Sequence, residues 1–127
     1  MESTLDALLA SHARRTPDQV LFEFLDDKAE PAEALSFGQL HRRASTLAAR
    51  LAQRAGSGEP VLVAAGPGSE HPVALFACFL AGATAVPVYP PQAATRAAML
   101  ETLAAICRAC GARTLLATRA VAQDLMP

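Results

Sequence analysis

The sequence is poor in aromatic side chains. Its 127 residues include five Phe, one Tyr and no Trp, so the apolar fraction of 52% consists largely of alanine and other aliphatic side chains. Small side chains allow helices to pack closely on a sheet, but each of them buries little area. A chain of this length is sufficient for one domain with a core. Apolar surface left outside that core would need to be covered by a partner or by further polypeptide.

An excess of positive charge, which drives binding to nucleic acid through counterion release, is also missing. The chain has 11 Lys and Arg against 12 Asp and Glu, which gives a formal net charge of -1. Four arginines do cluster, but helical periodicity places them on the polar side of one predicted helix: Arg42, Arg43, Arg50 and Arg54. We interpret them as a solvated face and expect no nucleic-acid partner.

No apolar run is suited to a membrane span or a signal peptide. The longest apolar stretch, from Pro72 to Val88, contains Gly82 and two prolines and is too short to cross a bilayer as a helix. The N-terminal residues carry charges, among them Glu2 and Arg15, without the apolar segment of a signal peptide. We therefore expect a soluble, cytoplasmic protein without a membrane span.

Cysteines are few, and their number excludes a disulfide framework. The three are Cys78, Cys107 and Cys110, of which the last two form a C-x-x-C pair. This pair falls at the end of a predicted helix, where the helix dipole opposes the thiolate that a redox pair needs. A structural zinc site needs four ligands at workable spacings. We favour buried structural cysteines over a redox pair or a metal site.

Hydrophobic periodicity predicts alternating helices and strands. Helices are expected near 4–14, 37–54, 72–81, 92–110 (or 95–110) and 119–125, and strands near 20–25, 34–36, 61–65, 84–88 and 114–117. The continuous apolar run from Val61 to Ala65 is typical of a strand buried on both faces of a parallel sheet. The fold class is therefore α/β: a partial three-layer sandwich of right-handed βαβ units with a mainly parallel sheet, preceded by an N-terminal helix and a hairpin.

Local signals mark where these elements begin and end. Ser36 with Gln39 predicts a capping box, and Ser3 or Thr4 is expected to cap the first helix. Pro72 suits the first position of its helix. Gly56 with Gly58, and likewise Gly82 and Gly111, are expected to end the helices that precede them. A long loop through Lys28 and Pro31 is expected to join the two strands of the hairpin.

The glycine-rich loop after the Val61 strand fits a nucleotide-binding motif only in part. Gly66 and Gly68 match the first two positions of a dinucleotide fingerprint, but His71 occupies the third. The sequence G-x-x-x-x-G-K-[ST] of a phosphate-binding loop is not found. We interpret the loop as a tight strand-to-helix turn, with ligand contact at the mouth of the sheet as the alternative.

No group of side chains stands out as a catalytic site. His12, His41 and His71 have no serine or cysteine nucleophile at a recognisable spacing, and His71 could cap the start of a helix. Four carboxylates and the only lysine lie close together in sequence and are interpreted as a solvated turn: Asp26, Asp27, Lys28, Glu30 and Glu33. We assign no catalytic, cofactor-binding or metal-ligating residue, and substrate-binding residues stay open.

Two stretches resemble the adenylate-forming (AMP-binding) superfamily. Leu35–Leu40 reads Leu-Ser-Phe-Gly-Gln-Leu, and Phe79–Pro87 contains the Leu-x-Ala-Gly-x-x-x-Val-Pro run of these enzymes. The ending Val86–Pro91 is most similar to fatty acyl-AMP ligases, and Gly111–Arg113 also fits the superfamily. The order and spacing of these short motifs are more specific than each motif alone.

The resemblance covers about Leu5 to Leu125 and implies that residues 1–127 form an incomplete N-terminal portion of an AMP-binding domain. Such enzymes, which include acyl-CoA synthetase-like proteins, join a carboxylic acid to ATP. They then pass the acyl group to the thiol of a carrier protein or of CoA. The resemblance implies ATP and Mg²⁺ for the full-length enzyme and none bound by this fragment. The phosphate loop with its lysine and the other ATP-contacting residues would lie beyond Pro127, so we expect a fragment inactive alone and leave open whether this chain is an enzyme.

The resemblance gives Leu35–Leu40 and Ala81–Pro91 structural roles, with contact between Tyr89 and an acyl substrate as an alternative. The partners that it implies are the remainder of the adenylation domain and an acyl carrier protein or CoA. Two alternative functions are consistent with the sequence. The chain could belong to an amino-acid-activating domain of a nonribosomal peptide synthetase, or it could be a small non-catalytic α/β binding or interaction module.

Overall fold

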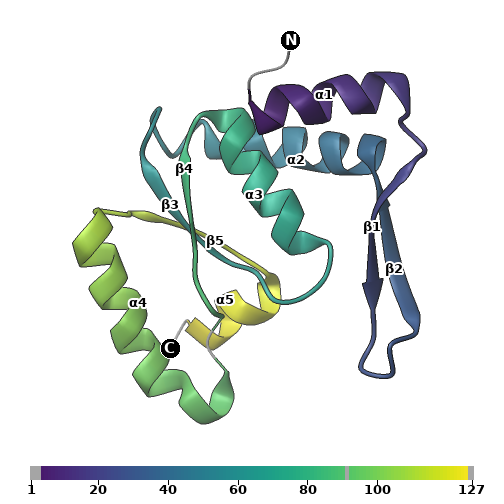
Figure 1. Ribbon diagram of the computed structural model, residues 1–127. Coiled ribbons are helices and arrows are strands. Elements are labelled where there is room, and N and C mark those ends of the chain that lie inside the picture. Colours follow the sequence, from purple (N-terminus) through teal and green to yellow (C-terminus); the bar gives the residue numbers. More distant parts are fainter. Residues whose placement is uncertain (1–3, 91, 126–127) are drawn as a thin grey trace.

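The computed structural model describes residues 4–90 and 92–125 of the chain (Figure 1). Its elements are α1 (Leu5–Arg15), β1 (Val20–Leu25), β2 (Pro31–Ser36), α2 (Phe37–Leu51), β3 (Pro60–Ala64), α3 (Glu70–Ala81), β4 (Thr84–Pro87), the 3₁₀ helix η1 (Ala93–Thr95), α4 (Arg96–Cys110), β5 (Thr114–Ala117) and α5 (Arg119–Leu125). None of the helices in these ranges has the length and apolar character needed to cross a membrane.

A parallel sheet with the strand order β4-β3-β5 forms the centre of the fold. In its register, Val61 of β3 pairs with Ala85 of β4 on one side and with Thr114 of β5 on the other. The β3 residues from Val61 to Ala64 are all buried. The continuous apolar run therefore correctly predicts a central strand, and the mainly parallel α/β fold is confirmed.

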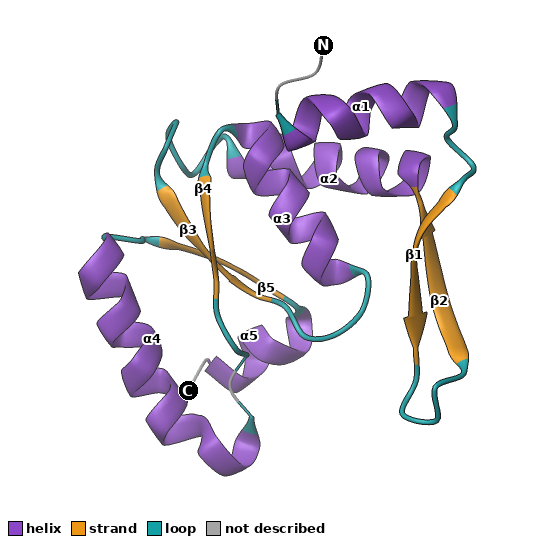
Figure 2. Cartoon of the chain, in the orientation of Figure 1, coloured by secondary structure: helices purple, strands orange, loops and turns teal. Residues whose placement is uncertain are grey.

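The two faces of this sheet are covered by different helices (Figure 2). On one face, Val61 and Val63 pack with Leu51 of α2 and Cys78 of α3 in a continuous core. On the other face, Leu62 and Leu103 of α4 line the same small cavity. This alternation follows from the two-residue period of a strand and confirms the predicted three-layer arrangement.

Strands β1 and β2 pair in antiparallel fashion as a separate two-stranded sheet, seen at the right of Figure 2. The second strand begins at Pro31, so the prediction of a long loop and a strand confined to 34–36 is wrong. The reason is local: the Asp26 carboxylate accepts hydrogen bonds from the backbone N–H groups of Lys28 (2.8 Å) and Glu30 (3.0 Å). One aspartate thus closes a short turn.

Helix α2 begins at the predicted capping box. Ser36 Oγ accepts from Gln39 N at 3.1 Å, and Gln39 Oε1 accepts from Ser36 N at 2.8 Å. The helix ends at Leu51 and not at Arg54, because the chain turns after it: the N–H groups of Arg54 and Ala55 both donate to the Leu51 carbonyl at 2.9 Å. At α1, Thr4 is the cap and Ser3 lies outside the described residues.

Helix α3 begins at Glu70, two residues before the predicted start. Pro72 is therefore the third helical residue, which costs no hydrogen bond because the first-turn N–H groups have no partner within the helix. The predicted stops are confirmed at Gly82 and Gly111, whose φ angles of +75° and +77° lie in the left-handed region. The last long helix, α4, starts at Arg96 after η1.

The prediction that all cysteines are buried is wrong for Cys110, which is exposed, while Cys107 is half-buried and Cys78 is fully buried. Helical spacing predicts an apolar stripe of Met99, Leu103, Ile106 and Cys110 on α4, but of these only Leu103 is buried. Periodicity identifies which face of a helix is apolar, but it does not show whether another element covers that face.

Candidate functional site

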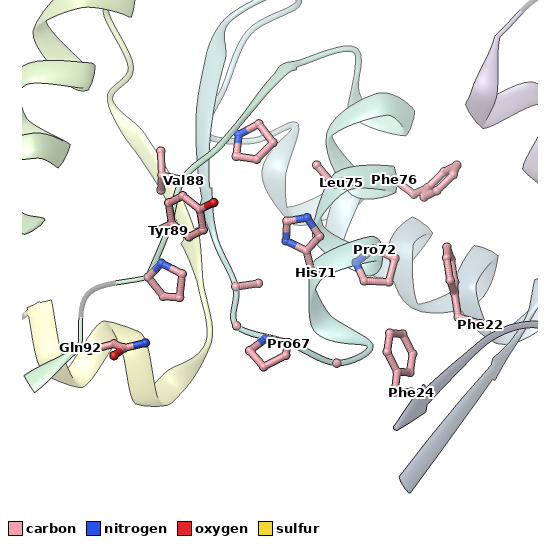
Figure 3. A pocket seen from close by; sticks show the side chains of 15 residues that line it. Phe22, Phe24, Pro67, His71, Pro72, Leu75, Phe76, Val88, Tyr89 and Gln92 are labelled. Carbon is pink, nitrogen blue, oxygen red and sulfur yellow. The ribbon is translucent and has the colours of Figure 1, made fainter. Parts of the chain in front are cut away.

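A cleft of about 870 Å³ opens at the carboxyl ends of β3 and β4 (Figure 3). Three parts of the chain form it: the first strand of the hairpin, the β3–α3 loop with the start of α3, and the segment that follows β4. The lining residues are Phe22, Phe24, Ala65–Gly68, His71, Pro72, Leu75, Phe76, Pro87–Pro90 and Gln92. Its position matches the general rule that open α/β sheets bind ligands beyond the ends of their strands.

One wall of the cleft is aromatic. Phe22 and Phe24 alternate along β1 and so project from the same face of the hairpin. Their ring centroids are 5.9 Å apart, with an angle of 27° between the rings. Figure 3 shows both rings on the side of His71 away from Tyr89. The sequence analysis recognised this strand but did not assign its two rings to a site.

The floor of the cleft includes the glycine-rich loop, which is the tight strand-to-helix turn that the sequence predicts. Gly68 has a φ of +114°, a conformation that L side chains rarely adopt. The next residue, Ser69, is only 3% exposed. Its N–H and its hydroxyl both donate to the carboxylate of Glu33, at 3.1 and 2.9 Å.

This contact corrects two predictions made from the sequence. Glu33 is exposed as predicted, but it lies on β2 and not in the turn, and it reaches the β3–α3 loop. Arg43 is not only part of a solvated face, because its Nη1 donates to Ser69 Oγ at 3.1 Å. Glu33 and Ser69 are 36 positions apart in the sequence, so no local pattern of residues predicts that they are in contact.

The opposite wall follows β4. The Val88 N–H donates to the Val63 carbonyl at 2.9 Å, which extends the sheet pairing by one step before the prolines. Tyr89 is 84% exposed and contributes to the lining. The prolines after Tyr89 predict that the chain leaves the sheet here, and β4 does end at Pro87; Pro91 lies outside the described residues.

The lining is apolar apart from a few groups. Its polar side chains, within the described residues, are those of His71, Tyr89 and Gln92, and it contains no carboxylate, lysine or arginine. Such a cleft can hold an apolar chain or ring. The described residues of the lining offer no cationic side chain to a triphosphate and no carboxylate to Mg²⁺.

The histidines have separate surroundings. His12 stacks on Phe37 with ring centroids 4.7 Å apart, and His41 is half-buried on α2. His71 follows the first residue of α3 and lines the cleft, while the position of the helix cap is taken by Ser69. Over residues 4–90 and 92–125, no group of three or more His, Cys, Asp or Glu could hold a metal ion.

Comparison with protein families gives a match that covers nearly the whole chain. Residues 9–126 match the family of AMP-binding enzymes. This chain belongs to the AMP-binding enzyme family. The resemblance carried by Leu35–Leu40 and Phe79–Pro87 is thereby confirmed, and the structure places the two stretches at the β2–α2 and α3–β4 junctions.

The chain is also similar in sequence to individual proteins. The 4-hydroxyphenylalkanoate adenylyltransferase of Mycobacterium tuberculosis is 36% identical over 94 residues, which is 72% of this chain and 15% of that enzyme. The phosphinothricin tripeptide synthetase of Streptomyces viridochromogenes is 41% identical over 114 residues, 89% of this chain and 9% of that protein.

A solved structure is similar over almost the full chain. The fatty acyl-adenylate ligase of L. pneumophila, in complex with acyl adenylate and pyrophosphate, superimposes with a TM-score of 0.86 at 27% identity, over 98% of this chain and 21% of that one. This chain therefore spans about a fifth or less of the length of each of these relatives.

Proposed function

We propose that residues 1–127 form the N-terminal portion of an adenylation domain that activates a fatty acid with ATP, and that the cleft binds the acyl chain. The observation that carries this proposal is the apolar lining of the cleft at the carboxyl ends of β3 and β4. A volume of about 870 Å³ is in the range of small-molecule sites. The similarity to a ligase crystallised with an acyl adenylate supports the same substrate class.

The ATP-dependent steps belong, on this proposal, to the remainder of the domain. The lining offers no group that would neutralise phosphate charge, so the described residues contribute binding and orientation of the acid. The acyl adenylate would then pass its acyl group to the thiol of a carrier protein or of CoA. We infer a cytoplasmic location from the need for ATP, and we expect the 127 residues alone to be inactive.

An amino-acid-activating domain is the second candidate, favoured by the 41% identity to the tripeptide synthetase. An amino acid carries an α-ammonium group, which needs a carboxylate partner when it is removed from water. Among the described residues, none of those that line the cleft carries a carboxylate. For this reason we propose a fatty acid and not an amino acid as the substrate.

The proposal is tested with a chimera in which this chain replaces the aligned segment of the L. pneumophila ligase. We expect the chimera to catalyse dodecanoate-dependent exchange of pyrophosphate into ATP, and the isolated chain to show none. Robust exchange by the isolated chain would contradict its inactivity. Exchange that responds to amino acids but not to dodecanoate would support the second candidate.

A charge placed in the cleft shows whether the acyl chain binds there. In the chimera, Phe24→Lys puts an ammonium group on the aromatic wall and is expected to raise KM for dodecanoate about tenfold or more, because burying an unpaired charge is costly. The KM for ATP should not change. Leu21→Lys, on the exposed face of the same strand, is the control. An unchanged KM in the Phe24 variant would rule out this cleft as the acyl site.

A further inference from the structure

Glu33 and Ser69 together connect three parts of the chain: the β1–β2 hairpin, the β3–α3 loop and α2. Its two carboxylate oxygens accept from the N–H (3.1 Å) and the hydroxyl (2.9 Å) of Ser69, the residue just before α3. The same hydroxyl accepts from Arg43 Nη1 of α2 at 3.1 Å. Ser69 is 3% exposed, so its N–H and hydroxyl would lose the acceptor to which both donate if Glu33 were removed.

The position of Glu33 in the hairpin connects this contact to the aromatic wall. In the β1–β2 register, Glu33 lies directly opposite Phe24, and Leu35 lies opposite Phe22. Directly opposed residues of an antiparallel pair project from the same face of the sheet. Glu33 therefore reaches toward the start of α3 from the same face, and at the same level, as the ring that lines the cleft.

The two ends of the hairpin are attached by different means. Near α2, Leu35 is buried in a cluster with Leu9, Leu40 and Val73. Toward the turn, the strand residues Leu25, Pro31 and Ala32 are exposed. A two-stranded hairpin has little stability by itself, so the outer part of the wall depends on what holds it to the rest of the molecule. Phe22 and Phe24 pack against the edge of the same cluster, and Glu33 adds hydrogen bonds to Ser69 at the level of Phe24.

We propose that Glu33 is a positioning residue of the cleft, which clamps the β1–β2 hairpin to the β3–α3 turn through Ser69 and so fixes the distance between the Phe24 wall and the floor. The clamp itself follows from the contacts above. Its consequence for an acyl chain rests on the proposed function. The charge of the carboxylate also suits its place at the positive end of the α3 dipole.

The clamp is tested first without any ligand, by amide hydrogen exchange in the 127-residue chain. Glu33→Ala is expected to lower the protection of the Ser69 amide and of the β1 amides near Phe24 by about tenfold, while α2 amides away from the contact keep theirs. Glu33→Gln retains one acceptor oxygen and should give an intermediate loss. Glu30→Ala, in the exposed turn of the same hairpin, is the matched control. Unchanged protection in both Glu33 variants would overturn the proposal.

The second test separates positioning from general stability. Dodecanoate binding to the chimera is measured by calorimetry well below the melting temperature of each variant, with folding checked by circular dichroism. Glu33→Ala should weaken binding about fivefold or more, and Glu33→Gln should restore part of the loss. Phe24→Ala should weaken binding in the wild-type background but add little in Glu33→Ala, because the ring is already misplaced.

The outcomes of the two tests distinguish the two proposals. Fully additive effects of Glu33→Ala and Phe24→Ala on binding would overturn the positioning role toward the acid. If the wild-type chimera binds no dodecanoate while Ser69 loses protection in Glu33→Ala, the clamp is supported and the assignment of the acyl site fails.

Discussion

Cys78 shows how folding changes the chemistry of a single side chain. It lies on α3 against β3, with none of its surface exposed. Burial raises the pKa of this thiol from 9.0 to about 11, because the thiolate would lose its hydration in the core. The thiol therefore stays protonated at neutral pH, which agrees with the structural role expected of it from the sequence.

This pKa shift predicts a loss of stability at alkaline pH. Below pH 9 the thiol is protonated in both the folded and the unfolded chain, so the free energy of unfolding is not affected by it. Between pH 9 and 11 the unfolded chain loses this proton and the folded chain keeps it, so the free energy of unfolding falls, on the order of 2 kcal/mol in total.

The measurement is urea unfolding at several values between pH 8 and pH 11. Cys78→Ala should flatten the decrease, although it also lowers stability at every pH because it leaves a small cavity. Cys110→Ala is the matched control, since this thiol is exposed in the folded chain. An equally steep decrease in Cys78→Ala would show that another group causes it.

At the scale of the elements, Gly82 controls how α3 leads into β4. Its left-handed conformation allows the N–H to reach the carbonyl of Phe79, and the next N–H bonds to Cys78 O at 2.9 Å. The chain then turns so that Thr84 pairs with Pro60 at the start of the parallel sheet. The glycine is required by its φ of +75°, which is costly for any residue with a Cβ.

Gly82→Ala is therefore expected to lower the free energy of unfolding by about 1–2 kcal/mol. Gly56→Ala provides the control, because a Cβ at that position meets no atom within 4 Å and its φ is not positive. That change should be close to neutral. Both effects are measured by urea denaturation, and equal losses in the two variants would argue against the conformational explanation.

Local signals located most of the elements. The capping box at Ser36 and the glycine stops at Gly82 and Gly111 need only residues within four positions of each other, and these are confirmed, whereas α2 ends at Leu51, before the predicted stop at Gly56 and Gly58. The start of β2 and the start of α3 were missed by two or three residues. In each case a proline sat at a boundary, where it is tolerated in more than one position of a strand or a helix.

At the scale of the whole molecule, the parallel sheet ends in two unpaired edges. Within the described part of the chain, β4 and β5 each pair with β3 alone. Leu115, on β5, is 38% exposed, and Val20 and Leu25 on the hairpin are more exposed still. Open edges with exposed apolar side chains favour association with further polypeptide or with other copies of the chain.

The isolated chain is therefore expected to self-associate as its concentration rises, as measured by sedimentation velocity. Leu115→Glu should reduce this association by placing a charge on the edge strand. Leu5→Glu, at an exposed position of α1 away from the sheet edge, is the control and should have a smaller effect. A monodisperse chain that melts cooperatively would contradict this and favour a small self-sufficient binding module.

The sequence by itself determined most of the secondary structure, the parallel sheet and the family. Each of these follows from short-range information: apolar runs, helical periodicity, caps, stops and the two motif stretches. Only the tertiary structure decided that Phe22 and Phe24 line a cleft with the loop after β3, and that Glu33 reaches Ser69 across 36 residues. The physical reason is that docking a hairpin onto a helix start depends on the packing of separate elements, which no local pattern of residues encodes.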